Sequence, residues 1–201
     1  MSITTEFFRH PFLTGAIAAS SGSLAAAMTR DLGLESAASV VELGPGTGVF
    51  TASIVDLLPP SASFAAIEIN PRLVASLRRA FPSVSVVSGS AEQLATLSAA
   101  PCDVVISGLP WTAMPAFRQV QVLDSVCAAL SLSGRFTTFA YAHTAWTPPA
   151  RRFARLLRSR FSVVERTRVV WGNLPPAYVY RAALPVRHLG ALREQPAAAA
   201  S

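Results

Sequence analysis

At 201 residues the chain is long enough for one domain with a complete hydrophobic core. It carries a formal net charge of +6, and all 17 of its basic residues are arginines. Such a surface favours phosphate-bearing partners, either nucleic acid or an anionic lipid surface, although GC-rich coding also explains arginine in place of lysine. The polar centre of the uncharged run at residues 11–29 excludes a membrane span there. Cys102 and Cys127 show no metal-ligand spacing and indicate reduced core thiols of a cytosolic protein, with no metal site.

The N-terminal residues 1–13 combine aromatic and aliphatic side chains with Arg9 and His10. This composition suits a membrane–water interface, and packing on the protein's own core is the alternative. Residues 14–23 contain glycines and several serines and are predicted to form a loop. A helix capped by a serine is expected to follow.

The stretch at residues 39–50 organises the rest of the chain. A buried strand at residues 39–43 precedes a loop with three glycines in five residues, and a helix begins near Val49. Glycines permit a tight turn and a close approach to a ligand, although a purely structural turn is the alternative. The dinucleotide fingerprint fails because its last glycine would fall on Val49. Glu42, just before the loop, would repel a pyrophosphate and attract the ammonium and sulfonium of S-adenosylmethionine.

Alternating strand and helix patterns continue to the C-terminus. Strands are predicted at residues 63–68, 84–87, 103–107 and 135–141, helices at 71–81, 91–97, 115–130 and from 148 onward, and a closing β-hairpin at 162–171 and 177–184. The pattern predicts an α/β fold with a mostly parallel seven-stranded sheet, helices on both faces and a C-terminal hairpin. Ligands of such sheets bind at the carboxyl ends of the strands. Glu68, Ser90, Ser107 and Tyr141 fall there, and Glu68 follows Glu42 by 26 residues, near the spacing of a ribose-binding acid.

Five blocks of sequence together resemble the bacterial phospholipid N-methyltransferases, which methylate phosphatidylethanolamine and whose relatives act on ornithine lipids. The blocks are FFRHPFLTGAIAASS at residues 7–21, ELGPGTGVFT at 42–51, EIN at 68–70, SGLP at 107–110 and NLPPAYVYR at 173–181. The resemblance covers residues 7–184 and implies a Rossmann-like class I methyltransferase fold. It implies a membrane-contacting segment and pocket lid at residues 1–22 and a methyltransferase domain at 23–190. Residues 191–201 are predicted to be a disordered tail.

The resemblance also implies a role for each matched position. Glu42 and the glycine loop would hold the methionine end of S-adenosylmethionine, Glu68 would bond its ribose, and Ile69 would pack on its adenine. Ser90 stands where the family has an aspartate that bonds the adenine amine, and a serine hydroxyl accepts a weaker hydrogen bond. The predicted cofactor-binding residues are Glu42, Gly44, Pro45, Gly46, Thr47, Gly48, Glu68, Ile69, Ser90, Ala91, Ser107 and Gly108.

Methylation of an amine requires its neutral form. An amine with a lysine-like pKa of ~10.4 is protonated at pH 7, and its deprotonation costs on the order of 4–5 kcal/mol. The site must therefore lower that pKa or supply a base. Tyr141 and His143, at the end of the fifth strand, are the candidate catalytic residues. The alternatives are a core tyrosine with a satisfied hydroxyl and a surface histidine.

The predicted substrate-binding residues are Leu109, Pro110, Trp111 and Asn173. Trp111 either caps the amine or packs under the next helix, and Asn173 either bonds the substrate or fixes the hairpin turn. The carbonyl groups of Ser107 and Leu109 are candidates for orienting the amine. The arginine-rich face at residues 151–160 either meets lipid phosphates or is solvated.

Three other functions are alternatives for a chain with these residues. Adenine-N6 dimethyltransferases of RNA share the glycine loop, but they carry Asn-Leu-Pro-Tyr where this chain has Gly-Leu-Pro-Trp at residues 108–111, and their RNA-binding C-terminal domain is not expected here. A cytosolic small-molecule N-methyltransferase and a membrane protein that binds the cofactor without chemistry are the others. The sequence favours a monomeric peripheral enzyme on the inner face of the membrane, which acts on phosphatidylethanolamine and its methylated forms and has no nucleic-acid partner.

Overall fold

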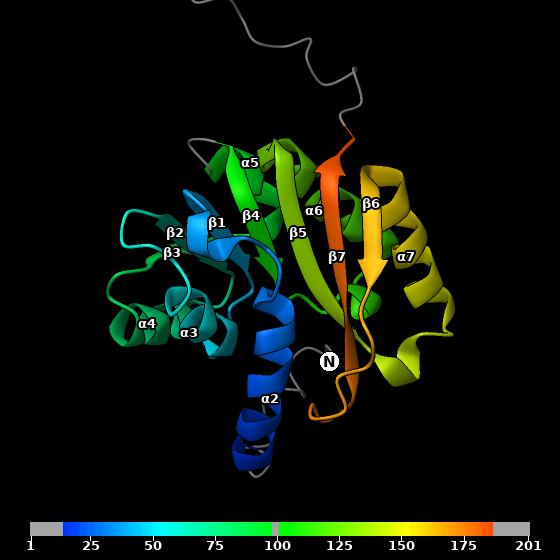
Figure 1. Ribbon diagram of the computed structural model, residues 1–201, viewed down its shortest axis with the longest axis horizontal. Helices are drawn as coiled ribbons and strands as arrows, with labels where there is room; N and C mark the ends of the chain where they lie inside the picture. Colours follow the sequence, from blue (N-terminus) through cyan, green and yellow to red (C-terminus); the bar gives the residue numbers. More distant parts are fainter. Residues whose placement is uncertain (1–13, 98–100, 187–201) are drawn as a thin grey trace, which may run out of the picture.

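One mixed β-sheet forms the centre of the computed structural model, which describes residues 14–97 and 101–186. The strands are β1 (Ser39–Leu43), β2 (Ser63–Glu68), β3 (Ser85–Ser88), β4 (Cys102–Ser107), β5 (Leu130–Tyr141), β6 (Phe161–Arg166) and β7 (Ala177–Pro185). The described residues form a seven-stranded sheet in the order β3-β2-β1-β4-β5-β7-β6 (Figure 1). Strands β1 to β5 are parallel, and β7 is antiparallel to both β5 and β6. The predicted fold class, with its C-terminal hairpin, is confirmed.

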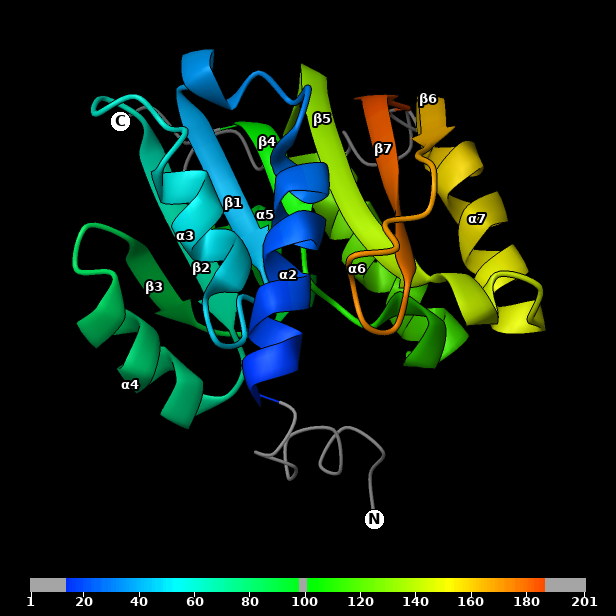
Figure 2. The same cartoon turned by 60° about the horizontal axis from the view of Figure 1, so that its bottom comes forward.

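Helices cover both faces of the sheet (Figures 1 and 2). They are α2 (Thr14–Thr29), α3 (Val49–Val55), α4 (Pro71–Ala80), α5 (Leu94–Leu97), α6 (Ala116–Ala129) and α7 (Pro148–Arg160), with short 3-10 turns η2 (Leu34–Ser36), η3 (Ala91–Gln93), η4 (Trp111–Ala113) and η5 (Ala142–Thr144). One core lies under α2, α3 and α4 and includes Met28 and Ile54. The other lies under α5, α6 and α7 and includes Leu123 and Phe153. Each helix thus buries one apolar face against the sheet.

The predicted loop at residues 14–23 is wrong, because α2 is helical from Thr14 onward. Alanine is the best helix former, and the segment is rich in it despite its glycines and serines. The C-terminal part of the helix is held by Leu24 and Met28, which are buried against the sheet. The predicted membrane segment at residues 1–13 and the predicted tail at 191–201 lie outside the described residues.

The strand directions bring distant parts of the chain to one edge of the sheet. Strand β6 runs in the direction of β5, because both are antiparallel to β7. The carboxyl ends of β1, β2, β4, β5 and β6 therefore share the edge at which β6 ends in Figure 1. We call this the carboxyl edge. It carries the glycine loop at residues 44–48, the loops after β4 and β5, and the connection between β6 and β7.

Candidate active site

The glycine loop adopts a conformation that requires glycine at three positions. The φ angles of Gly44, Gly46 and Gly48 are +68°, +59° and +91°, which lie in the left-handed region that other residues rarely adopt. A Cβ atom on Gly44 would lie 2.8 Å from Leu109, and one on Gly48 would lie 2.5 Å from Phe81. No atom of the described residues lies within 4 Å of the corresponding Cβ position on Gly46. The loop is thus closed against the protein at both ends and open at its tip, where a ligand can approach the backbone.

Glu68 connects the end of β2 to this open tip. Its Oε2 accepts a hydrogen bond from the Gly46 amide at 3.2 Å, and its Oε1 accepts one from the Asn70 amide at 2.8 Å. A carboxylate has about four lone-pair positions, so acceptor capacity remains for hydroxyl donors such as those of a ribose. Ile69, the next residue, is 65% exposed and offers an apolar surface beside it. The two neighbours therefore fit the sugar and the base of a nucleoside.

Glu42 lies beneath the loop and is completely buried. Its Oε2 accepts a hydrogen bond from Thr51 Oγ1 at 2.6 Å, whereas its Oε1 has no partner among the described residues. Burial raises the pKa of Glu42 from 4.5 to about 8; the bond from Thr51 opposes this rise, and the Glu68 carboxylate adds to it. A buried acceptor without a donor costs on the order of 1–3 kcal/mol. A cationic ligand at the loop would relieve this cost, as the ammonium of S-adenosylmethionine would do.

Two other predicted cofactor-binding residues, Gly108 and Ser90, already make hydrogen bonds within the protein. The Gly108 amide donates to the Leu43 carbonyl at 2.8 Å, and a Cβ on Gly108 would lie 2.7 Å from the Gly44 oxygen, so the ends of β1 and β4 are in close contact. The Ser90 hydroxyl accepts a hydrogen bond from the Glu92 amide at 3.4 Å and caps η3. Part of the acceptor capacity that the sequence assigned to adenine is therefore used within the protein.

Trp111 is a packing residue, which corrects its assignment to the substrate. It is 1% exposed, and its indole stacks on Phe153 with ring centroids 4.6 Å apart. The indole N–H donates to Ser107 Oγ at 3.1 Å. The ring is therefore surrounded by the core under α7 and cannot cap an amine in this arrangement. Of the two alternatives at this position, the structure has the packing one.

Asn173 belongs to the connection between β6 and β7. Its side chain is buried, and its Nδ2 donates to the Pro175 carbonyl at 2.7 Å. The Asn173 amide N–H donates to the Val170 carbonyl at 3.3 Å. These bonds fix the turn, which is one of the two roles that the sequence predicts for Asn173.

The loop after β4 presents little free backbone to an amine. The Ser107 carbonyl is buried and accepts a hydrogen bond from Thr138 Oγ1 at 3.0 Å. The Leu109 carbonyl accepts one from the Trp111 amide at 3.0 Å. Pro110 is exposed and Leu109 is half-buried, so of the two carbonyls that of Leu109 is the better placed to orient a ligand.

Tyr141 and His143 lie together at the end of β5. Their rings are nearly parallel, 20° apart, with centroids at 5.8 Å, and Tyr141 also contacts the edge of Phe139. Burial raises the pKa of the Tyr141 phenol above its usual value of 10, so the hydroxyl is protonated at neutral pH and its oxygen acts as a hydrogen-bond acceptor. His143 is exposed. The pair therefore offers a neutral hydroxyl and an accessible imidazole to a substrate amine.

Sequence reasoning missed three residues that shape this site. Thr51 bonds Glu42, Thr138 bonds Ser107, and the Asn70 amide bonds Glu68. Asn70 is part of the Glu-Ile-Asn block, and Thr51 ends the Glu42 block, so both lay within recognised motifs. Thr138 follows the β4 loop by about thirty residues, and only the pairing of Thr138 with Ser107 across β4 and β5 reveals it.

Comparison with known proteins agrees with this geometry. A model of the methyltransferase domain family matches residues 40–134. The chain is 31% identical over 182 residues to an ornithine lipid N-methyltransferase of Singulisphaera acidiphila, and the match covers 87% of this chain and 91% of that protein. The chain belongs to the bacterial lipid N-methyltransferase family. As a member of this family, it is a methyltransferase that uses S-adenosylmethionine.

Solved structures with the same fold are more distant in sequence. The N-methyltransferase NodS from Bradyrhizobium japonicum superposes with a TM-score of 0.66 at 16% identity, over 83% of this chain and 97% of that chain. Fibrillarin from Aeropyrum pernix, solved with bound S-adenosylmethionine, gives a TM-score of 0.61 at 16% identity, over 81% of this chain and 76% of that one. The likeness to these structures shows that this chain has the same fold. None of the helices in residues 14–97 and 101–186 combines the length and the apolar character that a membrane crossing requires.

Proposed function

We propose that this protein transfers methyl groups from S-adenosylmethionine to the amine of a membrane lipid head group. The candidate substrates are phosphatidylethanolamine and its methylated forms, and an ornithine lipid. The observation that carries the proposal is the similarity to an ornithine lipid N-methyltransferase along 91% of that protein's length. The open tip at Gly46, with Glu42 and Glu68 beside it, supports the cofactor half of this function.

When bound, S-adenosylmethionine supplies an electrophilic methyl group on a sulfonium. The residues of this chain must then hold the neutral amine in line with that group and keep water away. Glu42, Glu68 and the glycine loop would hold S-adenosylmethionine so that its methyl group could pass to the lone pair of the lipid nitrogen, with the electrons of the C–S bond left on sulfur. We propose that Tyr141 and His143 accept hydrogen bonds from the amine and that an imidazole or water takes its proton. The Leu109 carbonyl would orient the same nitrogen.

The membrane contact is also a proposal. Arg151, Arg152, Arg155 and Arg158 are exposed along α7, and arginine attracts the phosphates of an anionic surface. Arg160, by contrast, is held by Asp124, with Nε and Oδ1 2.6 Å apart. We propose that the exposed arginines hold a monomer at the inner face of the membrane, without a nucleic-acid partner. The segment at residues 1–13 is a second candidate for this contact.

The test is methyl transfer from labelled cofactor to vesicles that contain phosphatidylethanolamine, phosphatidylglycerol and ornithine lipid, with the products separated by head group. Label in a mono-, di- or trimethylated lipid supports the proposal and identifies the substrate. The variant Glu68→Gln should bind the cofactor about 100-fold more weakly, because the two hydrogen bonds that the carboxylate would accept from the ribose hydroxyls lose their charge assistance. Glu35→Gln, an exposed carboxylate on η2, is the matched control. No labelled lipid, with cofactor binding intact, contradicts the proposal.

A further inference from the structure

A hollow lies beside the proposed catalytic pair, at the carboxyl edge. It has a volume of about 630 Å³, and its lining includes Ala142, Ala145, Arg166, Arg168, Trp171 and Tyr178. One wall is the turn after β5 and the other is the connection between β6 and β7. The Ala142 amide donates to the Pro176 carbonyl at 2.8 Å and ties the two walls together. Ala142 directly precedes His143, so the hollow adjoins the place where the substrate amine would lie.

The charge of this hollow is not neutralised. Two of its lining residues are arginines, and none of the residues that line it is acidic. Among the described residues, the ion pairs join Arg118 to Glu92, Arg160 to Asp124 and Arg181 to Asp31. Arg166 and Arg168 take part in none of them. The guanidinium of Arg166 lies over the Tyr178 ring, with its Cζ atom 4.9 Å from the centroid, which holds the cation in place without cancelling its charge.

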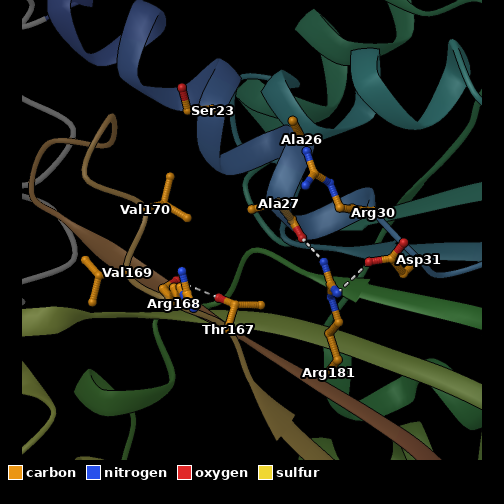
Figure 3. A pocket seen from close by; sticks show the side chains of 10 residues that line it. All are labelled: Ser23, Ala26, Ala27, Arg30, Asp31, Thr167, Arg168, Val169, Val170 and Arg181. Carbon is orange, nitrogen blue, oxygen red and sulfur yellow. Dashed lines mark hydrogen bonds and ion pairs between the residues drawn. The ribbon is translucent and has the colours of Figure 1, made fainter.

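A second hollow, of about 430 Å³, provides a contrast (Figure 3). It lies on the opposite face of β7, between α2 and the same connection, because Arg181 and Tyr178 alternate along that strand. There the Arg181 guanidinium is bound to Asp31 at 2.9 Å and to the Ala27 carbonyl at 3.2 Å (Figure 3). Arg181 lies opposite Thr137 in the register of β5 and β7, four residues before the end of β5, so this ion pair lies away from the carboxyl edge. The hollow itself also reaches the β6–β7 connection, through Thr167, Arg168 and Val169. Arg168 lines both hollows, and Arg30 lines the second one, whereas Arg166 lines only the hollow beside the turn after β5. None of these three arginines takes part in an ion pair among the described residues.

We propose that Arg166 and Arg168 bind the negatively charged group of the lipid head group whose amine is methylated. Phosphatidylethanolamine offers a phosphate and ornithine a carboxylate, and both suit the planar guanidinium. β6 lies two strand positions from β5, or about 10 Å, so a head group at the end of β5 can reach the end of β6. Trp171 is 78% exposed at the rim, and Trp146, beside Ala145, is 70% exposed. Indoles favour the membrane–water interface, which points to a lipid as the source of the anion.

This inference rests on the proposed lipid methylation, but it is tested first without a lipid. Soluble head-group probes are titrated while tryptophan fluorescence, to which Trp171 contributes, is recorded. The probes are O-phosphoethanolamine for the phosphate and Nα-acetylornithine for the carboxylate, with ethanolamine and inorganic phosphate for comparison. At least one zwitterionic probe should bind more tightly than ethanolamine by tenfold or more. The tighter of the two zwitterionic probes indicates which lipid class is the substrate. Tighter binding of inorganic phosphate than of either zwitterionic probe would overturn the lipid assignment.

The matched variants are Arg166→Gln/Arg168→Gln and the control Arg79→Gln/Arg135→Gln, which removes two exposed arginines outside the hollow. The first should weaken binding of the anionic probes at least tenfold, and the control should stay within twofold. With lipid in micelles, the KM of the first variant should rise while kcat stays within threefold, as expected of positioning residues. Unchanged affinity and KM would overturn the site while methylation stands. Selective loss of probe binding, with no lipid methylated by any variant, would retain the anion site and reject the proposed function.

Discussion

The two halves of the carboxyl edge are built in different ways. The half proposed to bind the cofactor, residues 39–97, is called the cofactor half. It presents backbone atoms and two carboxylates, Glu42 and Glu68, at the carboxyl ends of the neighbouring strands β1 and β2. The substrate half, residues 101–186, presents side chains from connections that lie far apart in the chain, such as Ala145 and Trp171 in one hollow. The first half is therefore a local motif placed by strand–turn–helix geometry. The second exists only where β5, β7 and β6 bring separate loops together.

The largest expected effect concerns Trp111, which lies at the border of the two halves. Trp111→Ala should lower the free energy of unfolding by about 3–5 kcal/mol, because it removes a buried ring that stacks on Phe153. The lipid KM of the folded fraction should stay within twofold. Denaturant unfolding and lipid kinetics measure the two effects. Trp146→Ala, at an exposed position, is the control and should change stability by less than about 0.5 kcal/mol. A stable Trp111→Ala with a raised lipid KM would return this residue to the substrate site.

The second prediction concerns the cofactor half and uses the pKa of Glu42. This pKa is raised to about 8 in the folded protein from 4.5, so between these pH values the folded state keeps a proton that the unfolded state has released. The stability of the cofactor-free protein should therefore fall as pH rises through this range, by on the order of 2 kcal/mol between pH 5 and pH 7. Denaturant titrations at several pH values measure the slope.

The matched variant for this slope is Glu42→Gln, which cannot release a proton. It should lack that part of the pH dependence, and saturating S-adenosylmethionine should reduce the slope of the unmodified protein, because a cation beside the carboxylate lowers its pKa. If stability depended on pH equally in the two proteins, the pKa of Glu42 would be the same in the folded and unfolded states. The conclusion that burial raises this pKa would then be wrong.

The smallest expected effect concerns the substrate half. Tyr141→Phe keeps the ring contacts with Phe139 and His143 and removes only the hydroxyl. Loss of one hydrogen bond to a charged or reacting amine should lower kcat by roughly 10-fold or more, with cofactor affinity within twofold. Steady-state kinetics and cofactor titration separate these effects. If the cofactor affinity fell as much as kcat, the residue would belong to the cofactor half and the division between the halves would fail.

Much of the fold could be predicted from the sequence because its signals are local. Each strand and the helix after it show their own periodicity of apolar residues, and a glycine or proline marks where the element ends. Strands β1 and β2 have the predicted bounds. Two strands have clearly different bounds: β5 begins at Leu130, not at residue 135, and β6 ends at Arg166, although the sequence predicts a strand as far as residue 171. A further difference is α2, where glycines and serines indicate a loop but the backbone is helical from Thr14. Its buried residues Leu24 and Met28 stabilise a continuous helix through tertiary packing, which overrides the weak local preference.

The sequence by itself determined the fold class, the family resemblance and the cofactor loop, because Glu42 and the glycine turn lie within seven residues of the chain and Glu68 ends the next strand. Only the tertiary structure decided that Trp111 lies in the core and that Glu42 is buried, with one carboxylate oxygen unpaired within residues 14–97 and 101–186. It alone placed Arg166 and Arg168 beside the turn after β5, with no carboxylate partner in the part of the chain that the structure describes. Burial and charge pairing depend on which distant side chains come into contact, and the order of the strands in the sheet, not the spacing along the chain, determines those contacts.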